Sequence, residues 1–246
     1  MEDKVRMDYE EYRLGASREF FWFKAKNELL EIFLRKLHFK RKLKILSVGV
    51  GTGEEIHVLH KFGVVDVLDI ENEVFNLIDK SIYRKKYLID ICALDLKERY
   101  DLIIGLDVLE HIEDDEKAID KIHKHLKKGG YFIFTVPSFS FLFSPRDTLL
   151  KHFRRYDPDK IKNLLERRFT IVYFSFWNSL LFFPIVIVRF TRKILNKKLR
   201  NIDYNVNKYI NKILYIVIQF DNFIIKKNKT LPIGLSIVGI CKKWEK

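Results

Sequence analysis

Short apolar runs alternate with helix-like segments between residues 44 and 136, and this alternation limits the fold more than any other feature of the chain. The runs with the length and composition of buried strands are Lys44–Val48, Val64–Leu68, Leu102–Leu106 and Tyr131–Val136, with Tyr87–Ile89 as a weaker one. The helix-like segments between them are Glu54–Phe62, Asn72–Lys80 and Asp114–Leu126. Such alternation is typical of right-handed crossovers in a mostly parallel sheet. We therefore predict an α/β, Rossmann-like fold with helices on both faces of the sheet.

Further elements are predicted on both sides of this alternation. Phe20–Leu37 has apolar residues at helical spacing, which indicates an amphipathic helix packed on the sheet. Asp157–Glu166 predicts another helix, and Thr170–Trp177 and Leu235–Cys241 predict two closing strands, so the sheet has seven strands. A chain of 246 residues is long enough for one large domain, and we expect no second independent core.

The segment before the last predicted strand differs in composition from the rest. Residues 178–230 hold eleven Lys or Arg and two Asp, a net charge of +9 in about a fifth of a chain whose total is +13. We therefore divide the chain into an N-terminal helical segment (1–40), a core (41–177 plus 231–246) and a hydrophobic, basic helical insertion (178–230) within the same domain.

Residues 171–188 contain no charged side chain, and these eighteen positions approach the minimum length of a membrane span. The first third alternates as a strand does, so only about a dozen apolar residues remain, which is too few to cross. With the +9 charge, the insertion predicts helices that lie on an anionic membrane surface. A helical cap over a substrate pocket and a membrane span are the alternatives.

Two observations bear on the compartment. Cys92 and Cys241 are far apart in the sequence, which argues against a disulfide framework and a cysteine metal site, and we assign no metal ligands. Residues 1–19 lack the basic and apolar regions of a secretion signal. We therefore expect a cytoplasmic protein. If the insertion binds lipid, the protein lies at the inner face of the membrane.

A glycine-rich turn, Gly49-Val50-Gly51-Thr52-Gly53, follows the first predicted strand, where backbone N–H groups can approach a ligand. The NAD fingerprint requires a glycine at the position of Glu54, whose charge disfavours a pyrophosphate. Asp69 ends the second strand, where it can accept the ribose hydroxyls of an adenosine. Asp90 ends the third strand and can meet an adenine amino group. Together these residues predict an adenosine-containing ligand at one sheet edge.

These residues resemble the cofactor motifs of class I S-adenosylmethionine-dependent methyltransferases. The resemblance rests on Lys44–Gly53 with Asp69 and Asp90, on Tyr100–Ile112 and on Leu126–Tyr131, and it spans about Phe20 to Cys241. One departure is Ser47, where the family usually carries an acid. We therefore expect somewhat weaker cofactor binding rather than its loss.

The resemblance implies S-adenosyl-L-methionine as the cofactor. The residues that it places there are Gly49, Val50, Gly51, Gly53, Asp69, Ile70, Asp90, Ile91 and Leu106. Asp69 would bind the ribose hydroxyls and Ile70 would pack on the adenine face. The backbone at Leu106 would meet the methionine amino group.

The acceptor side is predicted from two histidines. Methyl transfer is an in-line displacement from a sulfonium, and a base is needed only where the acceptor loses a proton. His111 follows the fourth strand, and His152 lies in a run, Lys151–Tyr156, similar to a histidine-arginine-tyrosine run of the family. A bond from His111 to a backbone group is the alternative for that residue.

Four further residues are candidates for substrate binding: Trp22, Arg154, Arg155 and Tyr156. Trp22 predicts either a lid or a contact with the core, and the arginines either grip an anionic acceptor or are surface charges. We predict a methyltransferase for a small-molecule, lipid-like or lipid-linked acceptor. An RNA or other nucleic-acid methyltransferase and a non-catalytic relative are the alternatives. The former is disfavoured because the aromatic residues of the insertion lie in apolar runs, not between basic residues.

Overall fold

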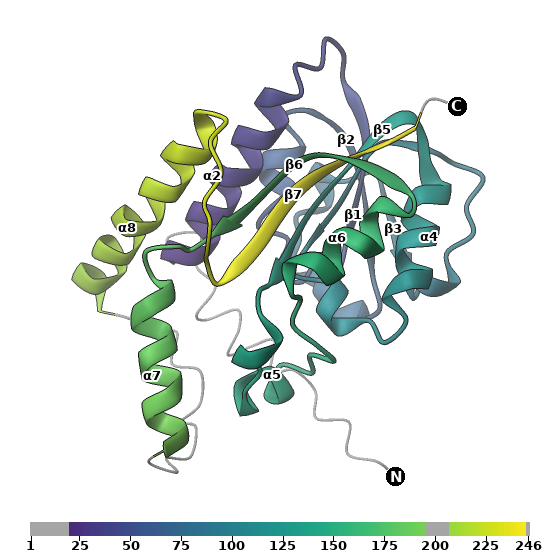
Figure 1. Ribbon diagram of the computed structural model, residues 1–246. Coiled ribbons are helices and arrows are strands. Elements are labelled where there is room, and N and C mark those ends of the chain that lie inside the picture. The colour runs from purple at the N-terminus through teal and green to yellow at the C-terminus, as the bar shows by residue number, and fades with distance from the viewer. Residues whose placement is uncertain (1–19, 195–206, 245–246) are drawn as a thin grey trace.

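A seven-stranded sheet lies between layers of helices in the computed structural model, which describes residues 20–194 and 207–244 (Figure 1). The strands are β1 (Leu43–Val48), β2 (Gly63–Asp69), β3 (Lys85–Leu88), β4 (Tyr100–Leu106), β5 (Leu126–Pro137), β6 (Phe169–Trp177) and β7 (Ser236–Lys243). Their order is β3-β2-β1-β4-β5-β7-β6, and β7 is antiparallel to both of its neighbours while the other pairs are parallel. The predicted Rossmann-like fold is confirmed.

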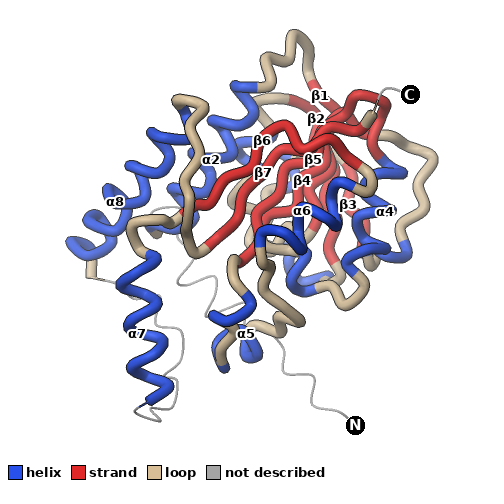
Figure 2. Tube along the Cα trace, viewed as in Figure 1, coloured by secondary structure: helices blue, strands red, loops and turns tan. Residues whose placement is uncertain are grey.

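Helices flank the sheet on both faces (Figure 2). The α-helices are α2 (Phe21–Lys36), α3 (Ile56–Leu59), α4 (Asp115–His125), α5 (Pro145–Leu149), α6 (Pro158–Glu166), α7 (Phe182–Ile194) and α8 (Lys208–Lys226). Short 3-10 helices are η1 (Asn72–Asn76), η2 (Lys80–Ile82), η3 (Ile91–Ala93), η4 (Leu109–His111) and η5 (Ser140–Leu142).

The strands are apolar on both faces because each face has its own core. On one side, Leu30 and Phe33 of α2 belong to a cluster with Val67 of β2. On the other side, Ile122 of α4 belongs to a cluster with Phe132 of β5. Burying each such side chain stabilises the fold by about 1.5–3 kcal/mol. The period-2 pattern of a half-exposed sheet is absent from these strands for this reason.

Two predicted helices are much shorter than expected. Glu54–Phe62 contains only the single turn α3, and Asn72–Lys80 forms η1 and the start of η2. Asn and Asp side chains bond to nearby backbone groups and so favour turns over helix interiors. Asp79, for example, accepts a hydrogen bond from the Ser81 N–H at 2.8 Å. The prediction of long helices there was wrong.

The predicted insertion lies between β6 and β7 and contains α7 and α8. Helix α8 packs along α2 (Figure 1). Buried polar groups fasten it: the Trp177 Nε1–H donates to Asn222 Oδ1 at 2.9 Å, and the Asn222 amide donates to the Ala25 carbonyl at 3.0 Å. The domain division stays a prediction, and residues 1–19 and 195–206 lie outside the described residues.

Large apolar side chains are exposed on α7 and α8. They are Phe183, Ile187, Val188 and Phe190 on α7, and Tyr209, Ile210, Ile213, Ile216, Phe220 and Phe223 on α8. We refer to them as the α7–α8 apolar residues. Within residues 20–194 and 207–244, no helix combines the length and the apolar character that crossing a membrane requires.

Candidate active site

The turn after β1 adopts a conformation that glycine takes readily. Gly49 and Gly51 have φ angles of +66° and +49°, in the left-handed region that side chains disfavour. A Cβ at Gly49 would lie 2.6 Å from a methyl carbon of Val108, whereas one at Gly51 would meet no described atom within 4 Å. The Gly53 N–H donates to the Val50 carbonyl at 2.7 Å and closes the turn. The turn is therefore packed at Gly49 and open at Gly51.

Asp69, the last residue of β2, lies beside this opening. Its Oδ2 accepts a hydrogen bond from the Gly51 N–H at 3.2 Å, and its Oδ1 accepts one from the Glu71 N–H at 3.0 Å. Burial raises the pKa of Asp69, against the opposing effect of these N–H groups. Each carboxylate oxygen can accept a second hydrogen bond. The open side of Gly51 and the Asp69 carboxylate therefore fit a ligand with paired hydroxyl groups, such as an adenosine ribose.

The other predicted cofactor residues lie at or just beyond the carboxyl ends of β2, β3 and β4. Ile70 is 66% exposed, which suits the apolar face of a ligand. Asp90 is exposed, and its Oδ1 accepts a hydrogen bond from the Cys92 N–H at 2.7 Å. Ile91 is buried in the core, and Leu106 is half-buried at the end of β4. The side chain of Ile91 thus packs in the core, so only the backbone of this residue could contact a ligand.

A carboxylate that sequence analysis missed lies next to Ser47. The Ser47 hydroxyl donates to Glu55 Oε1 at 3.0 Å. Glu55 comes directly before α3, so it follows the glycine turn. Burial raises the pKa of the Glu55 carboxyl to about 7. The acid expected at position 47 is therefore absent, but a carboxylate from the next element lies within hydrogen-bonding distance of that position.

A second acid, Asp107, follows β4 and pairs with the N-terminal helix. Its Oδ2 lies 3.0 Å from Lys26 Nζ of α2, and its Oδ1 accepts a hydrogen bond from the Thr135 hydroxyl at 2.7 Å. Desolvation raises the pKa of Asp107, but Lys26 and Thr135 outweigh it and the pKa is lowered. Lys26 thus brings a positive charge to the carboxyl ends of β4 and β5, and sequence analysis missed this residue also.

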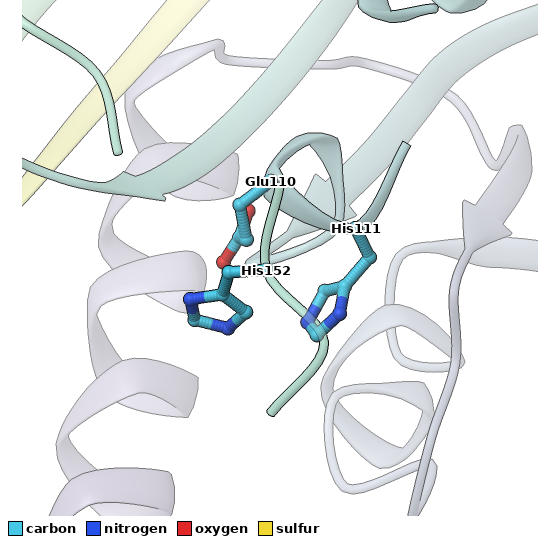
Figure 3. Close-up of side chains that lie close together, drawn as sticks. All are labelled: Glu110, His111 and His152. Carbon is cyan, nitrogen blue, oxygen red and sulfur yellow. The ribbon is translucent and has the colours of Figure 1, made fainter. Parts of the chain in front are cut away.

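The two predicted histidines lie side by side (Figure 3). His111 ends η4 and His152 follows α5, and their ring centroids are 4.6 Å apart at an interplanar angle of 88°. The Phe153 N–H donates to the Glu110 carbonyl at 2.8 Å and so joins the two segments. Desolvation, and next the neighbouring His152 ring, lower the pKa of His111 to about 4. The His111 ring is therefore neutral at pH 7.

Asp147 of α5 orients His152. Its Oδ1 lies 3.2 Å from His152 Nδ1 and accepts a hydrogen bond from Arg155 Nε at 2.7 Å. Burial raises the pKa of Asp147, but these partners outweigh it and hold the pKa far below its usual value. An ionised Asp147 places the ring proton of His152 on Nδ1. The Nε2 atom of His152 is left as a base or a ligand.

The remaining predicted substrate residues contact other parts of the protein. Arg154 forms an ion pair with Asp115 at 2.7 Å, and the Tyr156 hydroxyl donates to the same carboxylate at 2.8 Å. Trp22 packs against Trp177 with ring centroids 5.2 Å apart. These contacts hold the His152 loop and α2 in place, and the substrate roles of the three residues stay predictions.

Comparison with known proteins gives the relatives of the chain. Residues 14–206 match a family described as "Methyltransferase domain". The chain is 26% identical over 103 residues to the ubiquinone biosynthesis O-methyltransferase of Nitrobacter winogradskyi, covering 39% of each. It is 25% identical over 142 residues to the sterol 24-C-methyltransferase of Candida albicans, covering 51% of this chain and 38% of that protein. The chain thus spans less than half the length of these curated relatives.

A solved structure shares the fold over nearly the whole chain. The N-methyltransferase NodS from Bradyrhizobium japonicum, in complex with S-adenosyl-l-homocysteine, superposes with a TM-score of 0.58. The match covers 94% of this chain and 91% of that one at 14% sequence identity. At this identity the likeness establishes the fold.

Proposed function

The chain belongs to the family of class I S-adenosylmethionine-dependent methyltransferases, and on this premise we propose that it methylates a small-molecule, lipid-like or lipid-linked acceptor. S-adenosylmethionine supplies a methyl group on a positively charged sulfur. The observation that supports the cofactor part of this proposal, and so methyl transfer itself, is the open side of Gly51 next to the Asp69 carboxylate. It offers an adenosine both the space and the hydrogen-bond acceptors that its ribose needs.

Charges on three elements match the two ends of the cofactor. Asp69 would accept the ribose hydroxyls, with Ile70 and Asp90 at the adenine. Glu55 would meet the amino group of the methionine part, and Lys26 would meet its carboxylate. Because Lys26 and Glu55 come from α2 and from the segment after the turn, they can hold the methionine part at both of its charged groups.

Catalysis in this proposal rests on position. Holding acceptor and methyl in line, with water excluded, supplies most of the rate enhancement of such a displacement. His111 and His152 would line the acceptor side, with a neutral ring nitrogen available where the acceptor must lose a proton. Asp147 acts as a positioning residue because it fixes the proton on His152 Nδ1.

The preference for a lipid-like acceptor is supported by α7. Phe183 and Ile187 on this helix are 62% and 61% exposed. From the same helix, Arg189 Nη1 reaches within 3.5 Å of Asp147 Oδ2. The exposed apolar helix is therefore connected to the residue that orients His152. Exposed apolar side chains of this number are typical of sites that meet lipid or another protein.

We further propose that the α7–α8 apolar residues lie on an anionic membrane surface. Lys208 and Lys212 are exposed on α8 beside the apolar positions Tyr209 and Ile213. Apolar side chains that enter the interface, with lysines at the lipid headgroups, are how amphipathic helices bind such membranes. A lipid-like acceptor would then be reached from the membrane itself.

The acceptor class is tested with cofactor that carries a labelled methyl group. The purified chain is incubated separately with lipid, small-molecule and RNA fractions, with Asp69→Ala as the control that removes cofactor binding. We expect label in the lipid or small-molecule fraction. Label in RNA alone would establish the alternative and overturn the proposal, as would equal labelling by the control.

A further inference from the structure

Three side chains with metal-binding atoms converge at the end of β4 (Figure 3). Glu110 and His111 belong to η4, and His152 follows α5. One carboxylate oxygen and one ring nitrogen from each histidine all lie within 4.8 Å of one another. Two elements that are about 40 residues apart in the sequence thus bring a carboxylate and two imidazoles to one point.

One of the two histidines has a ring nitrogen bonded to a carboxylate of the protein. His152 Nδ1 pairs with Asp147 Oδ1 at 3.2 Å. Metal-binding histidines usually have this arrangement, in which a carboxylate or a carbonyl accepts from one nitrogen and orients the other toward the ion. The second ring nitrogen of His152, Nε2, is therefore the one that remains as a ligand.

Glu110 provides the independent observation. The residue is 1% exposed, and its Oε2 has no hydrogen-bond partner among the described residues. Buried carboxylate oxygens without a partner are rare because leaving water costs them their hydrogen bonds. An ion between Glu110 and the two histidines would provide the missing partner.

We propose that Glu110, His111 and His152 form a binding site for a first-row divalent transition metal ion, of which Zn²⁺ is the best match. Two imidazoles and one carboxylate suit Zn²⁺ and Fe²⁺ far better than Mg²⁺ or Ca²⁺, which prefer oxygen ligands. Ligands of a tetrahedral Zn²⁺ lie about 3.4 Å apart. Binding therefore draws the three groups, now within 4.8 Å, closer by up to about 1.4 Å.

Three protein ligands leave at least one coordination position open for water or for an oxygen of a bound molecule. At a given ring nitrogen, binding an ion excludes accepting a proton. The metal site and the base role of the histidines are therefore alternatives at that nitrogen.

The test uses the full chain, purified without a histidine tag and stripped with a chelator. Zn²⁺ binding is measured by calorimetry, and Co²⁺ by its visible absorption, which reports the ligands. We expect one saturable ion per chain. His111→Ala and His152→Ala should abolish it, and Asp147→Asn should weaken it by about 10- to 100-fold through loss of the orienting carboxylate.

Glu110→Gln keeps the shape of the side chain and tests the carboxylate without emptying the site. His60→Ala, at an exposed histidine on the α3–β2 connection, is the matched control and should bind as the original chain does. S-adenosylmethionine affinity, measured on the same samples, shows whether each variant is folded and separates this proposal from the proposed function. No saturable binding, or equal binding in folded His111→Ala and His152→Ala variants, would overturn the proposal.

Discussion

Replacing Asp69 tests the proposed cofactor site most directly. In Asp69→Ala the chain loses the carboxylate beside Gly51, which accepts hydrogen bonds from the Gly51 and Glu71 N–H groups at 3.2 and 3.0 Å. We expect the affinity for S-adenosylmethionine to fall because the two ribose hydroxyls lose their acceptor.

The magnitude follows from the hydrogen bonds at stake. A hydrogen bond to a charged group contributes about 1.5–3 kcal/mol. In the alanine variant, water can bond to the ribose hydroxyls and so recover part of this free energy. Two such bonds amount to about 2–4 kcal/mol, or roughly a 30- to 700-fold rise in Kd. Asp69→Asn keeps the size and one acceptor oxygen, so its loss should be nearer tenfold, about 1.4 kcal/mol.

The assay is calorimetric titration at pH 8, because burial raises the pKa of Asp69 and an alkaline pH favours its carboxylate form. Asp79→Ala is the matched control: Asp79 is an exposed acid on the same β2–β3 connection and caps η2 through the Ser81 N–H. It should bind the cofactor as the original chain does. A folded Asp69→Ala variant with undiminished affinity, or an equal loss in Asp79→Ala, would refute the placement of the ribose.

Three further predictions follow from buried groups and exposed helices. Burial raises the pKa of Glu55 from 4.5 to about 7, so between these values the folded chain keeps a proton that the unfolded chain has released. The free energy of unfolding should therefore fall by about 2.6 kcal/mol as pH rises from 4.5 to 7, and Glu55→Gln should remove this fall in denaturant titrations. Tyr156→Phe removes a buried hydroxyl that donates to Asp115 Oδ2 at 2.8 Å and lies 3.1 Å from the Leu109 carbonyl oxygen. The substitution should lower the free energy of unfolding by about 1–2 kcal/mol in the same assay, and an unchanged midpoint would contradict this. The double variant Phe183→Ser and Ile187→Ser removes two exposed apolar side chains of α7. It should weaken binding to anionic vesicles about tenfold in flotation assays, with melting unchanged; equal flotation would exclude α7 from the membrane contact.

The sheet was predictable from the sequence because burial on both faces makes each strand a continuous apolar run. The strand ends follow from the same signal, and Asp69 could be placed at the sheet edge for that reason. The short helices were less predictable. Around Asn72 and Asp79, apolar spacing suggested a helix, whereas local side-chain bonds favour 3-10 turns.

The unpredicted site residues depend on contacts between distant segments. Lys26 reaches Asp107 across 81 residues, and nothing in the local sequence of either residue indicates the pairing. Arg155, by contrast, was predicted as a substrate residue; its guanidinium donates to Asp147 and to the Ser138 carbonyl, and its substrate role stays a prediction. Glu110 stands between an apolar residue and a histidine, and this local sequence does not indicate burial. The residue is buried because η4 packs against the His152 loop.

Moving the acid from position 47 to Glu55 changes how the site responds to pH. Glu55, with a pKa of about 7, is protonated in about half of the free chains at pH 7. If Glu55 meets the cofactor ammonium group, binding must release that proton, so the affinity should rise with pH between about 6 and 8. Calorimetry in buffers of different ionisation enthalpy measures the release, which should vanish in Glu55→Gln. S-adenosylhomocysteine keeps the ammonium group and lacks only the transferred methyl group and the sulfonium charge, so it should release the same proton. Any difference in affinity between S-adenosylmethionine and S-adenosylhomocysteine must then arise nearer the sulfur. Proton release on binding S-adenosylmethionine but not S-adenosylhomocysteine would contradict this assignment of Glu55.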